Sequence, residues 1–218
     1  MAHLQLDLLL TDTGYKPKQA QRLRVYLTNS LEESHPDTGT LFANWLSSEA
    51  NEANHIKRDT PVMCILGNPP YSVSSTNKGE WIQNLIADYK KDLNERKINL
   101  DDDYIKFIRY GQYFIEKNGE GVLAYISNNS FIDGITHRQM RKNLLETFDK
   151  IYIIDLHGNT KKKETTPDGH KDENVFDIMQ GVSINIFVKT AKTTKLGKVF
   201  HYDVYGKRED KYDFLKNN

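Results

Sequence analysis

The chain has 218 residues, and its 30 Lys and Arg balance 30 Asp and Glu, so the formal net charge is zero. This balance argues against a simple basic nucleic-acid-binding module, whose isoelectric point would be high. No apolar run approaches the roughly 18 residues of a membrane-spanning helix, and residues 1–15 lack the pattern of a secretory signal, so we expect no membrane contact. The single cysteine, Cys64, cannot form an internal disulfide, which favours a cytoplasmic protein.

The apolar residues alternate between helical spacing and short continuous runs. In chain order, this pattern predicts a helix over 2–10, a strand over 24–28, a helix over 39–54 and a strand over 62–67. It then predicts a helix over 103–117, a strand over 121–127, a helix over 136–148, and strands over 151–156 and 182–189. Buried strands separated by amphipathic helices specify an open α/β sheet with helices on both faces. The run 62–67 is typical of a strand buried on both faces, so Cys64 is expected in the core.

Three of these elements carry further detail. On the helix over 39–54, one face presents Leu41, Phe42, Trp45 and Leu46. Thr136 is expected to cap the helix that follows it. The last two strands are joined by a polar loop of about 25 residues without a helical pattern, which favours an antiparallel return at the edge of the sheet.

The sharpest motif of the chain is Asn68-Pro69-Pro70-Tyr71, directly after the strand over 62–67. Ligands of open α/β sheets bind beyond the carboxyl ends of the strands. The two prolines fix the backbone and remove two N–H donors, which leaves carbonyl oxygens available. Carbonyl and amide oxygens beside an aromatic ring suit a planar group that bears an NH₂, because the oxygens accept its N–H hydrogens while the ring stacks on it. The alternative is an ordinary Pro-Pro turn closed by a surface tyrosine.

This tetrapeptide after a buried strand resembles the catalytic motif of amino-group methyltransferases that use S-adenosylmethionine, above all DNA adenine-N6 methyltransferases. Longer segments resemble the methyltransferase module of the Type ISP restriction-modification enzymes, which are large single polypeptides that also carry nuclease, helicase-like ATPase and target-recognition parts. These segments are 25–33, 57–72, 77–82, 101–117, 121–133, 151–164, 167–184 and 204–209. The resemblance implies a Rossmann-like class I methyltransferase sheet and, for the full-length enzyme, double-stranded DNA as the partner.

The resemblance also assigns roles to residues of the motif. Asn68 and the Pro69 carbonyl would accept hydrogen bonds from the target adenine's amino group and aim its nitrogen at the methyl group of the cofactor, with Pro70 completing the motif. Tyr71 would stack on the extruded base, and Phe176 would stack on its other face. Base flipping costs a few kcal/mol, and stacking on protein rings returns roughly 1–3 kcal/mol per base. The alternative for Phe176 is an ordinary packing residue at the entrance of a strand.

Weaker assignments concern cofactor, DNA backbone and metal. Asn29 matches a position that commonly contacts the cofactor's adenine ring, although the family usually has Asp there; the alternative is a simple turn residue. Lys161, Lys162 and Lys163 lie in the same loop as Phe176 and would contact DNA phosphates, or else form a solvated loop. No spacing of Cys, His and carboxylates supports a zinc site, so we expect no metal.

One part of the family pattern is missing from this sequence. The first two strands and the glycine-rich turn that holds S-adenosylmethionine should precede the segment seen here, and the only G-x-G, Gly119 to Gly121, comes before a strand instead of after one. We therefore expect a partial catalytic domain with a lead-in over 1–56, a catalytic core over 57–190 and the start of a connection over 191–218. Such a fragment would bind the cofactor weakly or not at all.

Two other functions stay open at this stage. The same tetrapeptide occurs in methyltransferases that modify glutamine side chains of proteins, because a carboxamide NH₂ resembles the amino group of adenine. The chain could also be a folded, non-catalytic fragment. Sheet edges that lack their neighbouring strands would favour self-association.

Overall fold

The computed structural model describes residues 2–16, 23–34, 44–71, 75–95, 100–191 and 196–218. The chain divides into two units, unit 1 from Met1 to Thr60 and unit 2 from Pro61 to Asn218, and each is described here by itself. Among the described helices, none has both the length and the apolar character needed to cross a membrane.

Unit 1 contains two helices, α1 (Ala2–Asp12) and α2 (Asn44–Asp59), which confirms the helix predicted at the start of the chain. Four apolar side chains were predicted to share a face of the second helix. Leu41 and Phe42 lie outside the described residues, and the side chains of Trp45 and Leu46 in α2 are not described.

The strand predicted over 24–28 is wrong, because these residues adopt no regular structure. Side chains of α2 hold this segment instead: Glu52 accepts a hydrogen bond from the Tyr26 hydroxyl at 2.6 Å, and Lys57 Nζ donates to the Asn29 carbonyl at 2.7 Å. A β-branched and aromatic run forms a strand only beside another strand, and the described part of unit 1 provides none.

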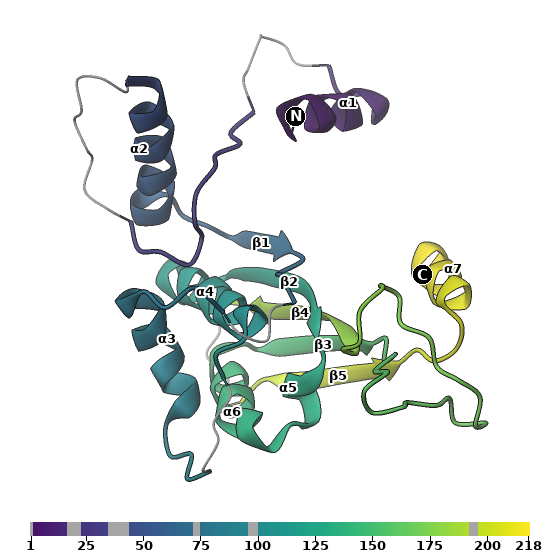
Figure 1. Cartoon of the computed structure of the whole chain (residues 1–218). Coiled ribbons are helices and arrows are strands. Elements are labelled where there is room, and N and C mark those ends of the chain that lie inside the picture. Colours follow the sequence, from purple (N-terminus) through teal and green to yellow (C-terminus); the bar gives the residue numbers. More distant parts are fainter. Residues whose placement is uncertain (1, 17–22, 35–43, 72–74, 96–99, 192–195) are drawn as a thin grey trace. The chain divides into compact units, whose positions relative to one another are not determined.

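Unit 2 is built on a five-stranded sheet (Figure 1). Its strands are β1 (Cys64–Gly67), β2 (Gly121–Asn128), β3 (Lys150–Asp155), β4 (Val182–Lys189) and β5 (Lys198–Asp203), in the spatial order β1-β2-β4-β3-β5. The strand β4 is antiparallel to both of its neighbours, whereas β1 pairs with β2 and β3 with β5 in parallel. The mixed α/β sheet predicted from the sequence is confirmed, and so is the antiparallel return from β3 to β4.

The position of this β3–β4 hairpin differs from the prediction. It lies inside the sheet, because β4 pairs with β2 and because β5 occupies the edge beyond β3. Every residue of β5 is exposed. An exposed edge strand lacks the apolar run that marks a buried strand in a sequence, which is why β5 escaped prediction.

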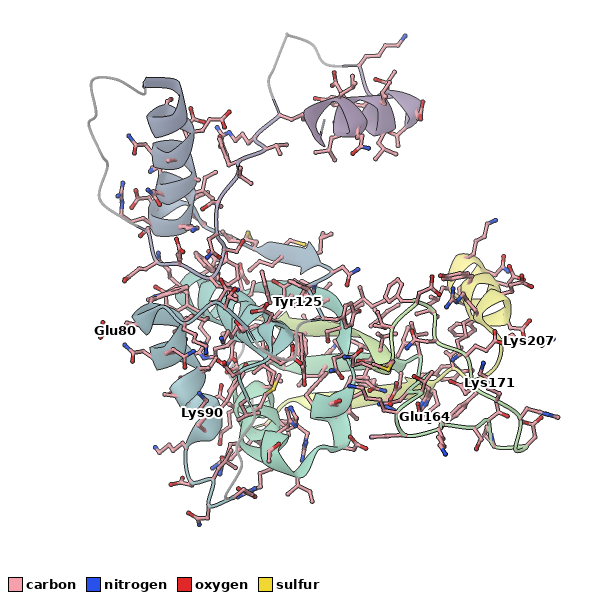
Figure 2. The ribbon with its side chains drawn as sticks, viewed as in Figure 1. Glu80, Lys90, Tyr125, Glu164, Lys171 and Lys207 are labelled. Atoms are coloured by element: carbon pink, nitrogen blue, oxygen red, sulfur yellow. The ribbon has the colours of Figure 1, made fainter. Side chains whose placement is uncertain are left out.

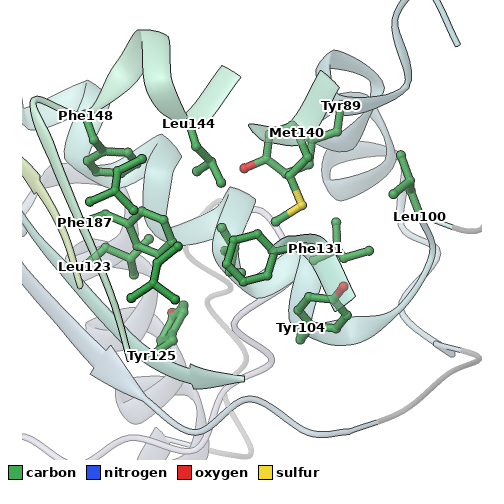
Figure 3. Packing of buried hydrophobic residues seen from close by; sticks show 14 of the residues in the cluster. Tyr89, Leu100, Tyr104, Leu123, Tyr125, Phe131, Met140, Leu144, Phe148 and Phe187 are labelled. Atoms are coloured by element: carbon green, nitrogen blue, oxygen red, sulfur yellow. The ribbon is translucent and has the colours of Figure 1, made fainter. Parts of the chain in front are cut away.

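The helices of unit 2 are α3 (Glu80–Lys90), α4 (Asp103–Asn118), α5 (Ser130–Asp133), α6 (Arg138–Thr147) and α7 (Arg208–Asn217), with a short 3₁₀ turn, η1 (Ile135–His137), before α6. On one face of the sheet, α3, α4 and α6 enclose the main core, whose members include Tyr104, Leu123, Met140, Leu144 and Phe187 (Figure 3). The expected Thr136 cap is wrong, since Thr136 lies within η1 and the residue before α6 is His137.

A smaller apolar cluster lies on the other face of the sheet, at the carboxyl end of β3. Its buried members are Leu156, Val175, Val182 and Val204, and Phe214 and Leu215 of α7 pack against them. On this face, α7 and the loop between β3 and β4 cover only the carboxyl end of the sheet, and Tyr152, Phe200 and Tyr202 are exposed. Among the described residues, the helices that cover the sheet therefore lie mainly on one face.

The strand β1 is more exposed than predicted. Only Ile65 packs against the main core, Leu66 is 76% exposed, and Cys64 is exposed instead of being a core residue. The cause is that β1 is an edge strand, which pairs with β2 and with no other strand among the described residues.

Candidate active site

The strands β1, β2, β3 and β5 run in the same direction, so their carboxyl ends meet at one edge of the sheet. The loop from 156 to 181 and α7 lie beyond this edge, and Figure 2 labels Glu164, Lys171 and Lys207 there. Asn129, just after β2, ties the edge together: its Nδ2 donates to Asp155 Oδ1 at 2.9 Å, and its N–H donates to the Gly181 carbonyl at 3.0 Å. We expect ligands of a parallel α/β sheet at this edge.

The tetrapeptide Asn68 to Tyr71 leaves the carboxyl end of β1 at this edge. Asn68 and Pro70 are exposed and Pro69 is buried. Within the described part of the chain, the Asn68 amide makes no hydrogen bond to another residue. The buried proline fixes the backbone, while the amide of Asn68 stays available to a ligand.

Tyr71 is half-buried, and its hydroxyl is buried without a hydrogen-bond partner among the described residues. Burial raises the pKa of the Tyr71 hydroxyl to about 12. The side chain is therefore neutral over the physiological pH range. The residue is partly exposed, whereas its hydroxyl is buried.

The structure brings Tyr71 and Phe176 together. Their ring centroids are 6.1 Å apart with an interplanar angle of 61°, an edge-to-face contact, and both rings pack against the cluster of Leu156, Val175 and Val182.

The loop that carries Phe176 is held by Asn174, which sequence reasoning missed. The buried Asn174 side chain accepts a hydrogen bond from the Phe176 N–H at 2.8 Å and donates to the carbonyls of Gly158 and Gln180 at 3.0 and 2.6 Å. Gly158 has φ +79°, and a Cβ there would lie 2.4 Å from Asn174 Cα, so the close crossing of the two segments requires glycine. The only sequence signal for these hydrogen bonds was an Asn two residues before an aromatic residue.

The other predicted site residues have local contacts. Asn29 belongs to unit 1, where its Oδ1 accepts the Leu31 N–H at 3.1 Å and its Nδ2 donates to Glu32 Oε1 at 2.9 Å, as in a simple turn. Its contact with the cofactor stays a prediction. Lys161, Lys162 and Lys163 are exposed in a turn of the Phe176 loop, and Lys162 Nζ lies 3.0 Å from Asp133.

Neither a metal nor the whole cofactor is accommodated by a dedicated set of described residues. Asp155, His201 and Asp203 place potential ligand atoms within 4.8 Å of one another, but Asp155 Oδ1 accepts the Asn129 bond and Asp203 Oδ1 lies 2.8 Å from His157 Nε2. Gly119, with φ +90°, ends α4 as its C-cap and does not form a phosphate- or cofactor-binding turn.

Residues 3–161 match the family model of the Eco57I restriction-modification methylase. Among curated proteins, none matches. The structure of the ATP-dependent Type ISP restriction-modification enzyme LlaBIII bound to DNA is 28% identical, with a TM-score of 0.79, and the match covers 99% of this chain and 14% of that one.

Two further structures are similar to this chain. The DrdV–DNA complex is 28% identical with a TM-score of 0.78, over 100% of this chain and 21% of that one. A nuclease-deletion mutant of the Type ISP enzyme LlaGI, in complex with a DNA substrate mimic, is 21% identical with a TM-score of 0.79 and shows the fold alone. The chain spans about a fifth or less of the length of these proteins. Because the family model matches most of its length, the chain belongs to the Eco57I restriction-modification methylase family.

Proposed function

We propose that the chain takes up the target base of a DNA adenine-N6 methyltransferase, within a restriction-modification enzyme that uses S-adenosylmethionine. The observation that carries this proposal is the contact of Tyr71 with Phe176 beside the exposed Asn68. Two aromatic rings and an unused amide at the carboxyl end of a strand form a site for a flat group with an NH₂. The amino group of adenine on a flipped nucleotide has this chemistry.

The catalytic contribution of this chain would be orientation of the amino nitrogen. Asn68 Oδ1 and the Pro69 carbonyl accept the two N–H hydrogens, which draws the nitrogen lone pair out of conjugation with the ring and directs it away from the base plane. When bound, S-adenosylmethionine supplies the methyl group. The raised pKa of Tyr71 keeps its hydroxyl protonated, so its role is to stack on the base and not to remove a proton.

The energetics of base uptake are nearly balanced. Flipping costs a few kcal/mol, and separating the edge-to-face pair of Tyr71 and Phe176 costs about 0.5–1.5 kcal/mol. Stacking returns about 1–3 kcal/mol for each ring. The hydrogen bonds to Asn68 and Pro69 then favour an adenine that presents its amino group correctly over a base that does not.

The similarity to proteins solved with DNA supports DNA as the substrate. LlaBIII and DrdV were both solved with DNA, and both are 28% identical to this chain. The exposed Lys161 and Lys163 lie on the same loop as Phe176, so they would meet the phosphates next to a flipped nucleotide. A protein with these roles works in the cytoplasm.

The test is a methyl-transfer assay with the native-length protein, using radiolabelled S-adenosylmethionine and two substrates in parallel. Duplex DNA of mixed sequence should take up label, and a glutamine-containing peptide should not. Label in the peptide alone would support protein glutamine methylation. Label in neither substrate would support a folded, non-catalytic role, and either result would overturn the proposal.

A further inference from the structure

Both backbone polar groups of Phe176 are hydrogen-bonded. Its N–H donates to Asn174 Oδ1, and its carbonyl accepts a hydrogen bond from Arg208 Nη2 at 3.1 Å. Arg208 Nε also donates to the Asn174 carbonyl at 2.8 Å. One guanidinium therefore bridges two carbonyls of the Phe176 loop, which fixes the segment between them.

Arg208 is the first residue of α7, and α7 itself is firmly attached to this loop. The fully buried Lys211 donates from Nζ to the carbonyls of Leu156 and Glu173 at 2.7 and 2.6 Å, and to the buried Asp172 at 2.8 Å. The other Asp172 oxygen accepts the Gly206 N–H at 2.7 Å. A buried ion pair with its hydrogen bonds satisfied fixes one geometry, so the guanidinium of Arg208 projects from a rigid base.

We propose that Arg208 is a positioning residue that sets the Phe176 ring for stacking on the target base, an assignment that rests on the proposed function. Stacking on the base requires the Phe176 ring at a defined position and angle relative to the base plane. Entry of the base also requires the Phe176 ring to separate from the Tyr71 ring. A loop held at two carbonyls and one N–H lets the ring turn about its side-chain torsions without losing its backbone position. The rigid fork of arginine can span two carbonyls at once, whereas the ammonium of lysine acts as a point donor.

The chain offers a closely matched control. Arg138 is the first residue of α6, as Arg208 is of α7, and its side chain is 39% exposed against 37% for Arg208. Its partners are Glu95 and the Ile135 carbonyl, away from Tyr71 and Phe176. Arg138→Lys therefore reports the general cost of the substitution at the start of a helix.

The experiment uses native-length protein and duplex DNA in which 2-aminopurine replaces the adenine that the protein methylates. Its fluorescence rises when the base leaves the stack. Arg208→Lys should lower both this signal and the single-turnover methylation rate of normal DNA by about tenfold, the low end of what one aromatic–base stack supplies. The dissociation constant for DNA and the midpoint of thermal unfolding should stay close to those of the wild type, and Arg138→Lys should change none of the four quantities.

A double-mutant cycle separates positioning from general stability. If Arg208 acts through Phe176, the variant with both Phe176→Ala and Arg208→Lys should be no slower than Phe176→Ala alone. Multiplying effects, or an unchanged Arg208→Lys variant of a wild type that does flip the base, would overturn this inference alone. A wild type that neither raises the fluorescence nor methylates adenine would overturn the proposed function and this inference with it.

Discussion

The two walls of the candidate site are built differently. The Asn68–Tyr71 wall follows an exposed edge strand, and neither the Asn68 amide nor the Tyr71 hydroxyl has a hydrogen-bond partner among the described residues. The Phe176 wall is held by Asn174 and Arg208, and behind them by the buried Lys211. Under the proposed function, this difference means that the Asn68 amide is unpaired within the described residues before the base binds, whereas the backbone that carries the Phe176 ring is already fixed by hydrogen bonds.

The largest expected effect is on the methylation rate and comes from a change in the Asn68–Tyr71 wall. Asn68→Ala should lower the methylation rate of the native-length protein by about 10²–10³-fold, the cost of removing one hydrogen-bonding group that orients the reacting atoms. Because Asn68 is exposed, the free energy of unfolding should change by less than about 0.5 kcal/mol. Single-turnover kinetics and urea denaturation measure the two quantities. Asn68→Asp, which keeps an acceptor oxygen, should retain more activity, and equal loss in both variants would remove Asn68 from its role.

The next largest effect is on the free energy of unfolding and comes from a change in the Phe176 wall. Asn174→Ala leaves the carbonyls of the buried Gly158 and the half-buried Gln180, and the Phe176 N–H, without their partner. The free energy of unfolding should fall by about 2–4 kcal/mol. Urea denaturation measures it, and Asn118→Ala, which loses one local bond on the surface, is the control. A loss no larger than that of the control would show that the Phe176 loop is not held in the way described.

Phe176→Ala should act on catalysis more than on folding. Loss of one stacking ring should lower the methylation rate by about 10- to 100-fold, corresponding to roughly 1–3 kcal/mol. Phe176→Tyr preserves the ring and should stay near the wild type. Methylation rates of the wild type and of both variants test whether the Phe176 ring contributes to catalysis. A Phe176→Ala variant as fast as the wild type would make Phe176 an ordinary packing residue.

The smallest effect concerns the pH dependence of Tyr71. Its folded pKa of about 12 lies above the value near 10 of an unfolded tyrosine. The contribution to stability is therefore complete below about pH 10 and is lost as the pH rises towards about 12. For a half-buried ring we expect a loss of about 1 kcal/mol. Urea denaturation of the wild type and Tyr71→Phe from pH 8 to 11.5 should show a flatter profile for the variant, whereas parallel profiles would contradict the assignment.

The sequence predicted the central part of this fold well, because buried strands carry long apolar runs. The elements at 121–127, 151–156 and 182–189 are strands, and the helix at 103–117 is present. The edges were harder: β5 has no buried residue, and Cys64 is exposed in β1 because only β2 pairs with that strand. The residues 24–28 have strand-forming side chains but no strand beside them among the described residues.

The candidate site divides in the same way. The proposed roles of Asn68 to Tyr71 follow from their chemistry. The family resemblance predicted Tyr71 and Phe176 on opposite faces of a base; in the structure the two rings contact each other, and their stacking on a base stays a prediction. The residues that hold the Phe176 loop could not be predicted. Arg208 lies 32 residues after Phe176, with β4 and β5 between them. Neither residue type alone signals such a bridge. Asn29 was assigned from the family resemblance; its side chain bonds within a turn, its carbonyl accepts a bond from Lys57, and its contact with the cofactor stays a prediction.

The central claim is that Asn68 orients the amino group of adenine in DNA. The most direct measurement is mass-spectrometric analysis of the nucleosides released from duplex DNA after incubation with S-adenosylmethionine and either the native-length protein or its Asn68→Ala variant. The account predicts N6-methyladenine with the wild type and none above background with the variant. A methyl group on cytosine alone, or equal amounts of N6-methyladenine with both proteins, would contradict it.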